Sequence, residues 1–526
     1  MSQKILKPTR RDFLKYGLSG AAVLSTAAYS NIAIANNIPR HHLINIVRRG
    51  GWDSLWFHNA VPLSEIQDIV ETSRLLVSSQ SFVNNSGNIL APYADVYKNA
   101  LKGQWTQRFP DSNIFYHPDG QTTLGPGLNF MNPSDLQEMC IWRGITSEGG
   151  HDLGNQILQM GALGGNYPSF SAGVATYASK AGINRKLQYV QIAANSVELC
   201  TQTGEFSEHV QPINLPNLGT WQNITSSSTS YLTNAKRRQL VDQAVESLSK
   251  VVSKNTSTNA STQNVFSSFL NSFIGGNSIS GSNFATSTEF LSIFEAYKSE
   301  IRSIVNNHIF KTTWFSSSGA TDIVATNGYV DQLSFRFALA EFLVVKDLST
   351  VVDILVPGEA DFHNNANRDA LFHLGLYAAY TILVRRLKKT ELTPGASALE
   401  YTTVVMHSEF ERHPIISHLD ESSKLTPGAD HWGPATSIWL AGKGVNKGKV
   451  IGDFKRGTSS SKFGSSSYNA FKPYYALPVD KSSGQVSLSG IFPHIKNLNP
   501  TILAIFGASG YSKLNGINPF TPVTKL

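Results

Sequence analysis

Acidic and histidine side chains recur in this sequence directly after apolar runs, where they could bind a metal ion or move a proton. Carboxylate oxygens and imidazole nitrogens are the protein ligands that hard and borderline divalent metals prefer. The candidates, in chain order, are Asp53, His151, Asp152, Asp361, His363, Glu409, Glu411, Asp430 and His431, and Arg412 follows Glu411 as a cation that could hold an anion.

The spacing of these residues favours a metal centre. Asp361 and His363 are two residues apart, so in extended backbone both side chains project to the same side and could bind one ion. Asp53 and Glu409 could bind or bridge a second cation, and Asp430-His431 lies in a turn from which either side chain could point inward. Two divalent ions about 4 Å apart can hold the attacking and leaving oxygens of an ester displacement.

Each candidate also has a purely structural interpretation. Asp53, after two glycines, suits a turn or a helix N-cap. His151 could cap the helix that follows it, and Glu409 could form an ion pair with Arg412 alone. His373 lies in an apolar helical pattern, so we expect it to pack in the core.

Apolar runs alternate with helical patterns and must position these side chains. Continuous apolar character is typical of strands that are covered on both faces. We predict strands at 43–47, 138–144, 187–193, 351–358, 402–410 and 437–442, and helices at 155–165, 331–348 and 367–389. This alternation predicts an α/β three-layer sandwich with a mainly parallel central sheet, whose carboxyl edge would gather the candidate residues.

The middle of the chain differs in composition. Residues 221–283 are rich in Ser, Thr and Asn, with helical pieces between the polar stretches. We therefore predict one large domain over 36–526, in which 201–330 is a cap or insertion of helices and polar loops.

The first 35 residues have the character of an export signal. Paired Arg10 and Arg11 precede Phe13, a short stretch rich in small and apolar residues follows, and 33–35 suit a signal peptidase. This resembles a twin-arginine signal and predicts a folded passenger of the twin-arginine export machinery, in the periplasm or secreted. The alternative is a membrane anchor. No later run is long and charge-free enough to span a bilayer.

Charge and cysteine content set further limits. Removal of residues 1–35 takes away five of 44 basic and one of 37 acidic residues and leaves a net charge of +3. The basicity therefore belongs mostly to the signal and gives no reason to expect nucleic-acid binding. Cys140 and Cys200 could pair in an oxidising compartment or stay as buried thiols.

The motifs together resemble a known family. Residues about 40–60, 120–165 and 350–455 resemble the bacterial exported family known as domain of unknown function 1501, which is similar in fold to the alkaline phosphatase and sulfatase superfamily. The segments that carry the resemblance are Gly50-Gly51-Trp52-Asp53, Gly150-His151-Asp152, Asp361-Phe362-His363, Ser408-Glu409-Phe410-Glu411-Arg412 and Asp430-His431-Trp432-Gly433.

The resemblance implies two metal sites, one from Asp361, His363 and His431 and the other from Asp53 and Glu409. Relatives of known activity place a Ser, Thr or modified Cys nucleophile at the helix start where this chain has Gly150-His151, and Ser147 is not at the matching position.

The resulting hypothesis is a metal-dependent hydrolase-like protein that acts on phosphate or sulfate esters through a metal-activated water. His151 and Arg412 would be its catalytic residues, with Arg48 or Arg49 as further candidates to hold the anion. The ion could be Zn, Mn, Mg or Ca. The alternative is a non-catalytic periplasmic or surface-associated binding or scaffold protein. An oxidoreductase has little support, because the first strand lacks a dinucleotide fingerprint and the chain has no Cys cluster.

Overall fold

The computed structural model describes most of the core of the chain. It covers residues 40–52, 54, 57–58, 115–120, 122–148, 150–163, 168–193, 210, 212–226, 243, 247, 279, 282–308, 310, 328–358, 366–416, 429–432, 435–456, 474–512 and 516–525. The predicted signal, residues 1–35, and most of the polar middle lie outside the described residues.

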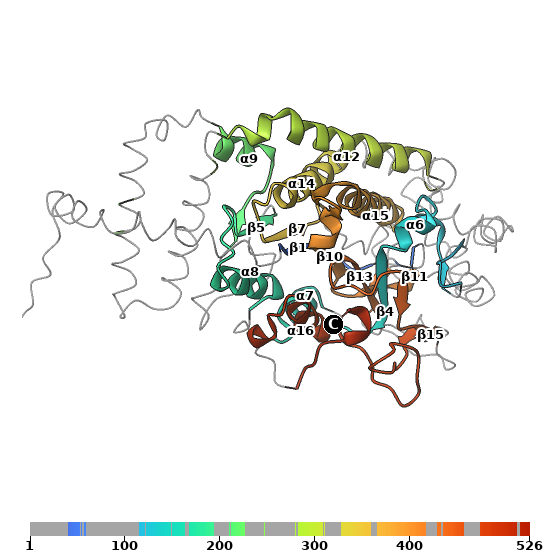
Figure 1. The fold of residues 1–526 in the computed structure, drawn as a ribbon. Coiled ribbons are helices and arrows are strands. Elements are labelled where there is room, and N and C mark those ends of the chain that lie inside the picture. The colour runs from blue at the N-terminus through green and yellow to red at the C-terminus, as the bar shows by residue number, and fades with distance from the viewer. Residues whose placement is uncertain are drawn as a thin grey trace, which may run out of the picture.

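An eight-stranded sheet forms the centre of the molecule (Figure 1). Its strands, in spatial order, are β14 (Lys449–Ile451), β4 (Met139–Ile145), β13 (Thr436–Gly442), β10 (Thr402–Ser408), β1 (His42–Arg48), β7 (Val351–Leu355), β5 (Tyr189–Ile192) and β6 (Ile213–Asn214). All the residues of β1, β4, β7, β10 and β13 are buried. This agrees with the apolar runs, because strands covered on both faces need not alternate with polar residues.

The strand directions bring the candidate segments to one edge. β13 runs antiparallel to β10 and β4, and the other pairings in the sheet are parallel. The carboxyl ends of β1, β4, β7 and β10 therefore lie at the edge where β13 begins. Residues that follow four strands and precede a fifth meet there, as in the open α/β sheets that bind ligands at this edge.

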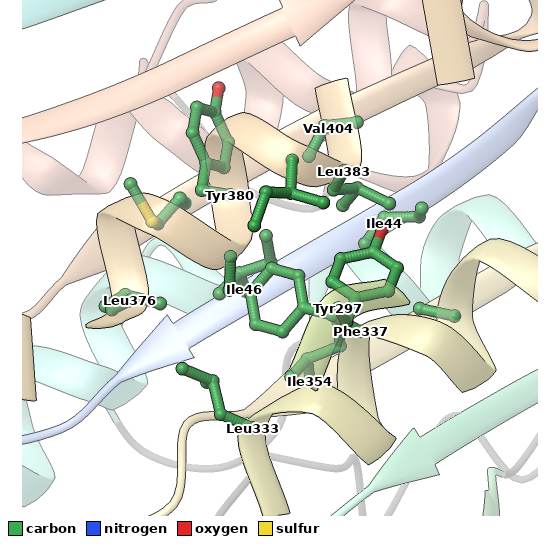
Figure 2. Close-up of a cluster of buried hydrophobic side chains, with 14 of the residues drawn as sticks. Ile44, Ile46, Tyr297, Leu333, Phe337, Ile354, Leu376, Tyr380, Leu383 and Val404 are labelled. Atoms are coloured by element: carbon green, nitrogen blue, oxygen red, sulfur yellow. The ribbon is translucent and has the colours of Figure 1, made fainter. Parts of the chain in front are cut away.

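Three helices cover one face of the sheet. They are α12 (Thr288–Asn307), α14 (Tyr329–Val345) and α15 (Ala366–Lys389). Figure 2 shows how Ile44 and Ile46 of β1 point into the layer that Tyr297, Phe337 and Leu383 fill from these helices. The last turn of α15 carries three basic side chains, whose positive charges complement the helix dipole: Arg386, Lys388 and Lys389.

Three more helices cover the opposite face (Figure 1). They are α7 (His151–Met160), α8 (Phe170–Lys180) and α16 (Leu498–Ile505). The Ser169 side chain accepts a hydrogen bond from the Ala172 backbone N–H and caps α8. The C-terminal segment thus belongs to the core, because α16 packs against α7 and α8.

Smaller elements complete the described chain. The strands are β2 (Phe115–Tyr116), β3 (Thr123–Leu124), β8 (Glu391–Thr393), β9 (Ala396–Ser397), β11 (Glu411–Ile416), β12 (Ala429–Trp432), β15 (Phe454–Arg456) and β16 (Tyr474–Ala476), and the helices are α6 (Pro133–Leu136) and α9 (Leu218–Thr225). None of the helices in the described ranges combines the length and apolar character that crossing a bilayer requires.

The fold class predicted from the sequence is confirmed: this is an α/β fold with a mainly parallel mixed sheet between helices. Each of the six predicted strands and three predicted helices overlaps an observed element of the same type. α12 lies within the predicted insertion 201–330 and packs against α14 and α15. Cys140 carries a free, buried thiol whose pKa burial raises, and Cys200 lies outside the described residues.

Candidate functional site

The turn after β1 forms one wall of the site. Gly50 and Gly51 have φ angles of 101° and 86°, which side chains other than glycine rarely adopt. A Cβ atom on Gly51 would lie 2.6 Å from the Phe410 ring. Glycine is therefore needed at Gly51 both for its backbone conformation and for the close approach of the segment after β10.

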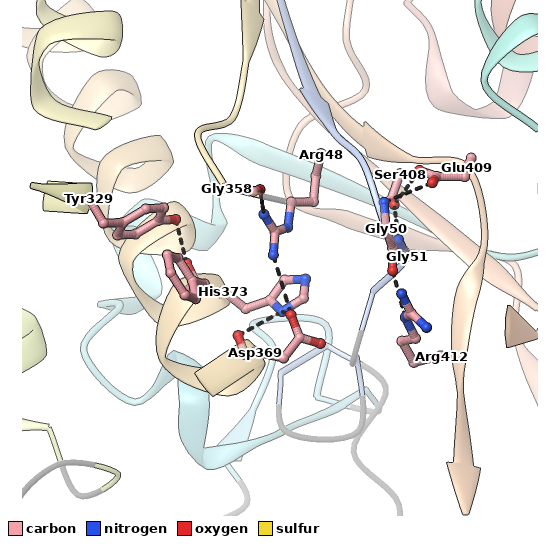
Figure 3. A network of polar contacts seen from close by, with 11 residues as sticks. Arg48, Gly50, Gly51, Tyr329, Gly358, Asp369, His373, Ser408, Glu409 and Arg412 are labelled. Carbon is pink, nitrogen blue, oxygen red and sulfur yellow. Dashed lines mark hydrogen bonds and ion pairs between the residues drawn. The ribbon is translucent and has the colours of Figure 1, made fainter. Parts of the chain in front are cut away.

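Glu409 lies directly beyond β10, and its carboxylate is fully buried. The Gly50 backbone N–H donates to Oε1 at 2.7 Å, and the Ser408 hydroxyl donates to Oε2 at 3.0 Å. The Gly51 N–H donates in turn to the Ser408 hydroxyl at 3.1 Å. Figure 3 shows Ser408 and Glu409 beside the two glycines. The turn after β1 and the end of β10 are thus joined through one carboxylate.

His151 supplies the third contact of that carboxylate. It is the first residue of α7, after Gly150 at the N-cap, and its Nδ1 lies 2.7 Å from Glu409 Oε1. Because an ionised carboxylate can only accept, the hydrogen lies on Nδ1, which leaves Nε2 as the basic nitrogen of the neutral ring. Gly154 permits this approach, since a Cβ there would lie 2.9 Å from the Glu409 Cβ.

Aromatic and cationic groups border the pair. The rings of His151 and His431 have centroids 4.4 Å apart, and the Phe410 ring stacks on His431 at 4.3 Å. His431 lies on β12 opposite Arg412 of β11. Arg412 is buried, and its Nε donates to the Gly50 carbonyl at 2.5 Å. The predicted residues His151, Glu409, Arg412 and His431 therefore do come together.

Arg48, a candidate to hold the anion, is instead buried in contacts with other parts of the protein. Its guanidinium is fully buried, donates to the Gly358 carbonyl at 2.8 Å and lies 3.3 Å from Asp369 Oδ1 (Figure 3). His373 Nδ1 lies 3.0 Å from the same Asp369 oxygen. Arg48 therefore holds together the two ends of segment 359–368 and does not face solvent. His373 is a packed core histidine, as expected, although it also contacts a carboxylate.

Three predicted ligands, Asp53, Asp361 and His363, lie outside the described residues. Among the residues that are described, no group of three His, Cys, Asp or Glu side chains is arranged to hold a metal ion. His151, Glu409 and His431 are nevertheless ligand types that suit Zn or Mn. The two-metal assignment stays a prediction.

Some contributors to the site had no role in the sequence-based prediction. The sequence-based prediction assigns no function to Ser408 or to Gly154. The dipeptide Ser408-Glu409 at the end of an apolar run was the available signal for Ser408. The sequence contains no signal for Gly154, because the need for a glycine inside a helix is apparent only when the residue packed against it is known.

One comparison with known proteins concerns this edge of the sheet. Residues 336–464 match the family described as "Protein of unknown function (DUF1501)". The match includes Glu409, Arg412 and His431, and the resemblance inferred from the sequence is confirmed for these residues. No curated protein matches the chain. The wider likeness to alkaline phosphatases and sulfatases stays a prediction.

Proposed function

We propose that this protein is an exported, metal-dependent hydrolase that acts on phosphate or sulfate esters. The observation that carries the proposal is the contact between His151 Nδ1 and the buried Glu409 carboxylate at the carboxyl edge of the sheet. A carboxylate that accepts from Nδ1–H fixes the orientation and the tautomer of a histidine, as in many general bases.

In this proposal His151 accepts a proton from the attacking water at Nε2. Glu409 stabilises the imidazolium that forms, and the Gly50 N–H and the Ser408 hydroxyl hold the carboxylate in place. Asp361, His363 and His431 are the predicted ligands of one metal ion, and Asp53 with Glu409 would hold a second. The bound ion would lower the pKa of water toward neutrality.

Arg412 and Arg49 are the remaining candidates to bind the anion. The guanidinium of Arg412 lies beside the site, with its Nε bonded to Gly50 and its centre 5.6 Å from the Phe410 ring. Arg49 is partly exposed and lies 3.4 Å from the exposed Asp152 carboxylate. Arg48 is excluded from this role by its burial and its two contacts.

The first test combines metal analysis with a panel of chromogenic esters. We expect the purified mature protein to bind a divalent metal and to hydrolyse at least one phosphate or sulfate ester when Mn, Zn, Mg or Ca is supplied. Asp361→Ala and His431→Ala should lower metal content, whereas His151→Gln should keep metal and lose about 10² to 10⁴ in kcat. A wild-type protein that binds no divalent metal would refute the proposal.

A binding or scaffold role is the second candidate. It is favoured by one observation, that α7 begins with His151 and not with a Ser or Thr nucleophile. Metal bound without turnover of any ester would support this candidate over hydrolysis.

The export part of the proposal has its own test. The paired arginines Arg10 and Arg11 predict passage through the twin-arginine machinery. Replacement of both by lysine should retain the precursor in the cytoplasm, as fractionation and mass spectrometry of the N-terminus would reveal. Unchanged export of the doubly substituted protein would contradict this route.

A further inference from the structure

Several buried polar atoms of α7, β10 and β13 have no hydrogen-bond partner among the described residues. Neither amide atom of Asn155 has a hydrogen-bond partner among the described residues, and the same holds for His407 Nδ1 and Thr436 Oγ1. All three side chains are more than nine-tenths buried. Each unpaired buried donor or acceptor lowers the stability of the fold, so a folded protein rarely leaves several of them.

The helix side of this cluster is fixed by its neighbours in α7. His151, Asn155 and Gln159 are spaced by four residues and therefore lie along one face of the helix. His151 contacts Glu409 at one end, and Gln159 Nε2 lies 3.5 Å from His407 Nε2 at the other. Asn155 must lie between these contacts, against the carboxyl half of β10.

The sheet side is fixed by strand register. His407 and Glu409 are two residues apart and point to the same face. Ile438 of β13 pairs with His407, and Thr436 precedes Ile438 by two residues in the same strand, so Thr436 lies near the carboxyl end of β10. Asn155, His407 and Thr436 thus approach the same volume from two strands and one helix.

The hydrogen-bond role of His407 follows from a network beneath it. His407 Nε2 lies 2.8 Å from Asn45 Oδ1, and Asn45 Nδ2 donates to Asp353 Oδ1 at 3.1 Å. The oxygen of Asn45 must accept, so His407 carries its hydrogen on Nε2 and presents an acceptor at Nδ1. Ser171 and Tyr189 also donate to Asp353. His407 therefore has polar neighbours at Nε2, whereas Nδ1 has no partner among the described residues.

We propose that Asn155, His407 and Thr436 form an internal water site that holds one or two water molecules. A water there can donate to His407 Nδ1 and to Asn155 Oδ1, and can accept from Asn155 Nδ2 or the Thr436 hydroxyl, which gives it the two to four partners that a buried water needs. The water joins α7 to β10 and β13 directly behind Glu409. This inference does not depend on the proposed function.

A crystal structure of the wild-type mature protein at about 2 Å or better is the direct test. We expect electron density for water within hydrogen-bond distance of both the Asn155 amide and His407 Nδ1. An empty volume, or an Asn155 amide bonded directly to protein groups, would overturn the proposal. Because this test uses the wild-type protein, it decides whether the water site exists even if the variants described below fail to fold.

A double-mutant cycle tests whether the residues share the same water. Asn155→Leu and Thr436→Val should each lower Tm, and the double variant should lose less than the sum, because the first substitution already removes the shared water. The control pairs Asn155→Leu with Thr381→Val. Thr381 is buried in α15 on the opposite face of the sheet and bonds the Tyr377 carbonyl, so that pair should be additive. Additivity in both pairs, or a higher Tm for Asn155→Leu alone, would count against the water site.

Discussion

Arg48 and Arg49 are adjacent in sequence but lie in opposite environments. Arg48 is fully buried between the Gly358 carbonyl and Asp369, whereas Arg49 faces an exposed Asp152 carboxylate. Removal of one partner from a buried ion pair leaves an uncompensated charge, while exposed pairs contribute little. The same residue type should therefore matter very differently at these two positions.

We predict that Arg48→Met lowers the free energy of unfolding by about 3–5 kcal/mol, because Asp369 then stays buried with His373 as its remaining described ionic contact. Arg49→Met, the matched control, should change it by less than about 1 kcal/mol. Urea unfolding of both variants measures the difference. Equal losses would show that Arg48 does not hold the segment ends together.

Gly154 is the residue through which α7 reaches Glu409. Gly154→Ala places a Cβ within 2.9 Å of the Glu409 Cβ, so we expect a loss of about 1–3 kcal/mol of stability and lower ester hydrolysis as His151 moves from the carboxylate. Gly510→Ala is the control, because its Cβ would meet nothing within 4 Å. Unfolding curves and initial rates measure the two effects. If Gly154→Ala behaved like Gly510→Ala, α7 would not be pressed against Glu409.

At the scale of elements, the antiparallel insertion of β13 depends on a glycine. Gly442 ends β13 with φ of 90°, and a Cβ there would fall on the Thr402 carbonyl oxygen at the start of β10. Gly395 has a similar φ of 80° but open space around it. The two positions share backbone strain, and only Gly442 adds a steric conflict.

We predict that Gly395→Ala costs about 1–2 kcal/mol, from the left-handed backbone alone, and that Gly442→Ala costs about 3 kcal/mol or more beyond that. Thermal and urea unfolding measure both. Similar losses of stability for the two variants would mean that β10 and β13 can move apart near Gly442 without a loss of free energy of unfolding.

The sequence predicted the main strands and helices because each is a long apolar or helical pattern. It did not predict that β13 is antiparallel, since direction depends on which neighbours a strand finds. The direction of β13 matters for the site. His431 precedes β13 in sequence, and because β13 is antiparallel it begins at the edge of the sheet where β10 ends. The sequence also predicts no element for β11, and the prediction that Asp430-His431 lies in a turn is wrong, because these residues form β12, which pairs with β11.

The sequence predicted which residue types form the site better than it predicted which of these residues contact each other. The place of Glu409 after an apolar run predicts a metal ligand. Its observed partners include the Gly50 N–H and His151 Nδ1. Backbone donors leave no trace in a sequence, and the distance between α7 and β10 depends on Gly154. The role of Arg48 was hidden for the same reason, since an arginine beside a glycine turn gives no sign of burial.

At the scale of the whole molecule, several buried histidines are kept neutral by the fold. Burial lowers the pKa of His407 and of His42 to about 3 and holds the pKa of His58 well below its usual value. A histidine in the unfolded chain titrates near 6.5. Between these values the unfolded state binds protons that the folded state does not, so acid favours unfolding.

Asp353 opposes this trend. Burial raises its pKa from 3.8 to about 6, so the folded state binds a proton more tightly than the unfolded state does. Its contribution to stability is present below about pH 4 and is lost as the pH rises through 6. One carboxyl group opposes three or more histidines, so the histidines should determine the sign.

We therefore predict that the free energy of unfolding is highest near neutral pH and falls as the pH is lowered from about 6.5 toward 4. His407→Gln keeps a donor for Asn45 but cannot titrate, so it should remove about 3 kcal/mol of the loss between pH 6.5 and 4. Asp353→Asn should make the loss steeper between pH 4 and 6, since it removes the opposing group. Urea unfolding at intervals of half a pH unit measures all three profiles. A wild-type profile that is flat or rises toward pH 4 would show that these histidines are protonated in the folded protein.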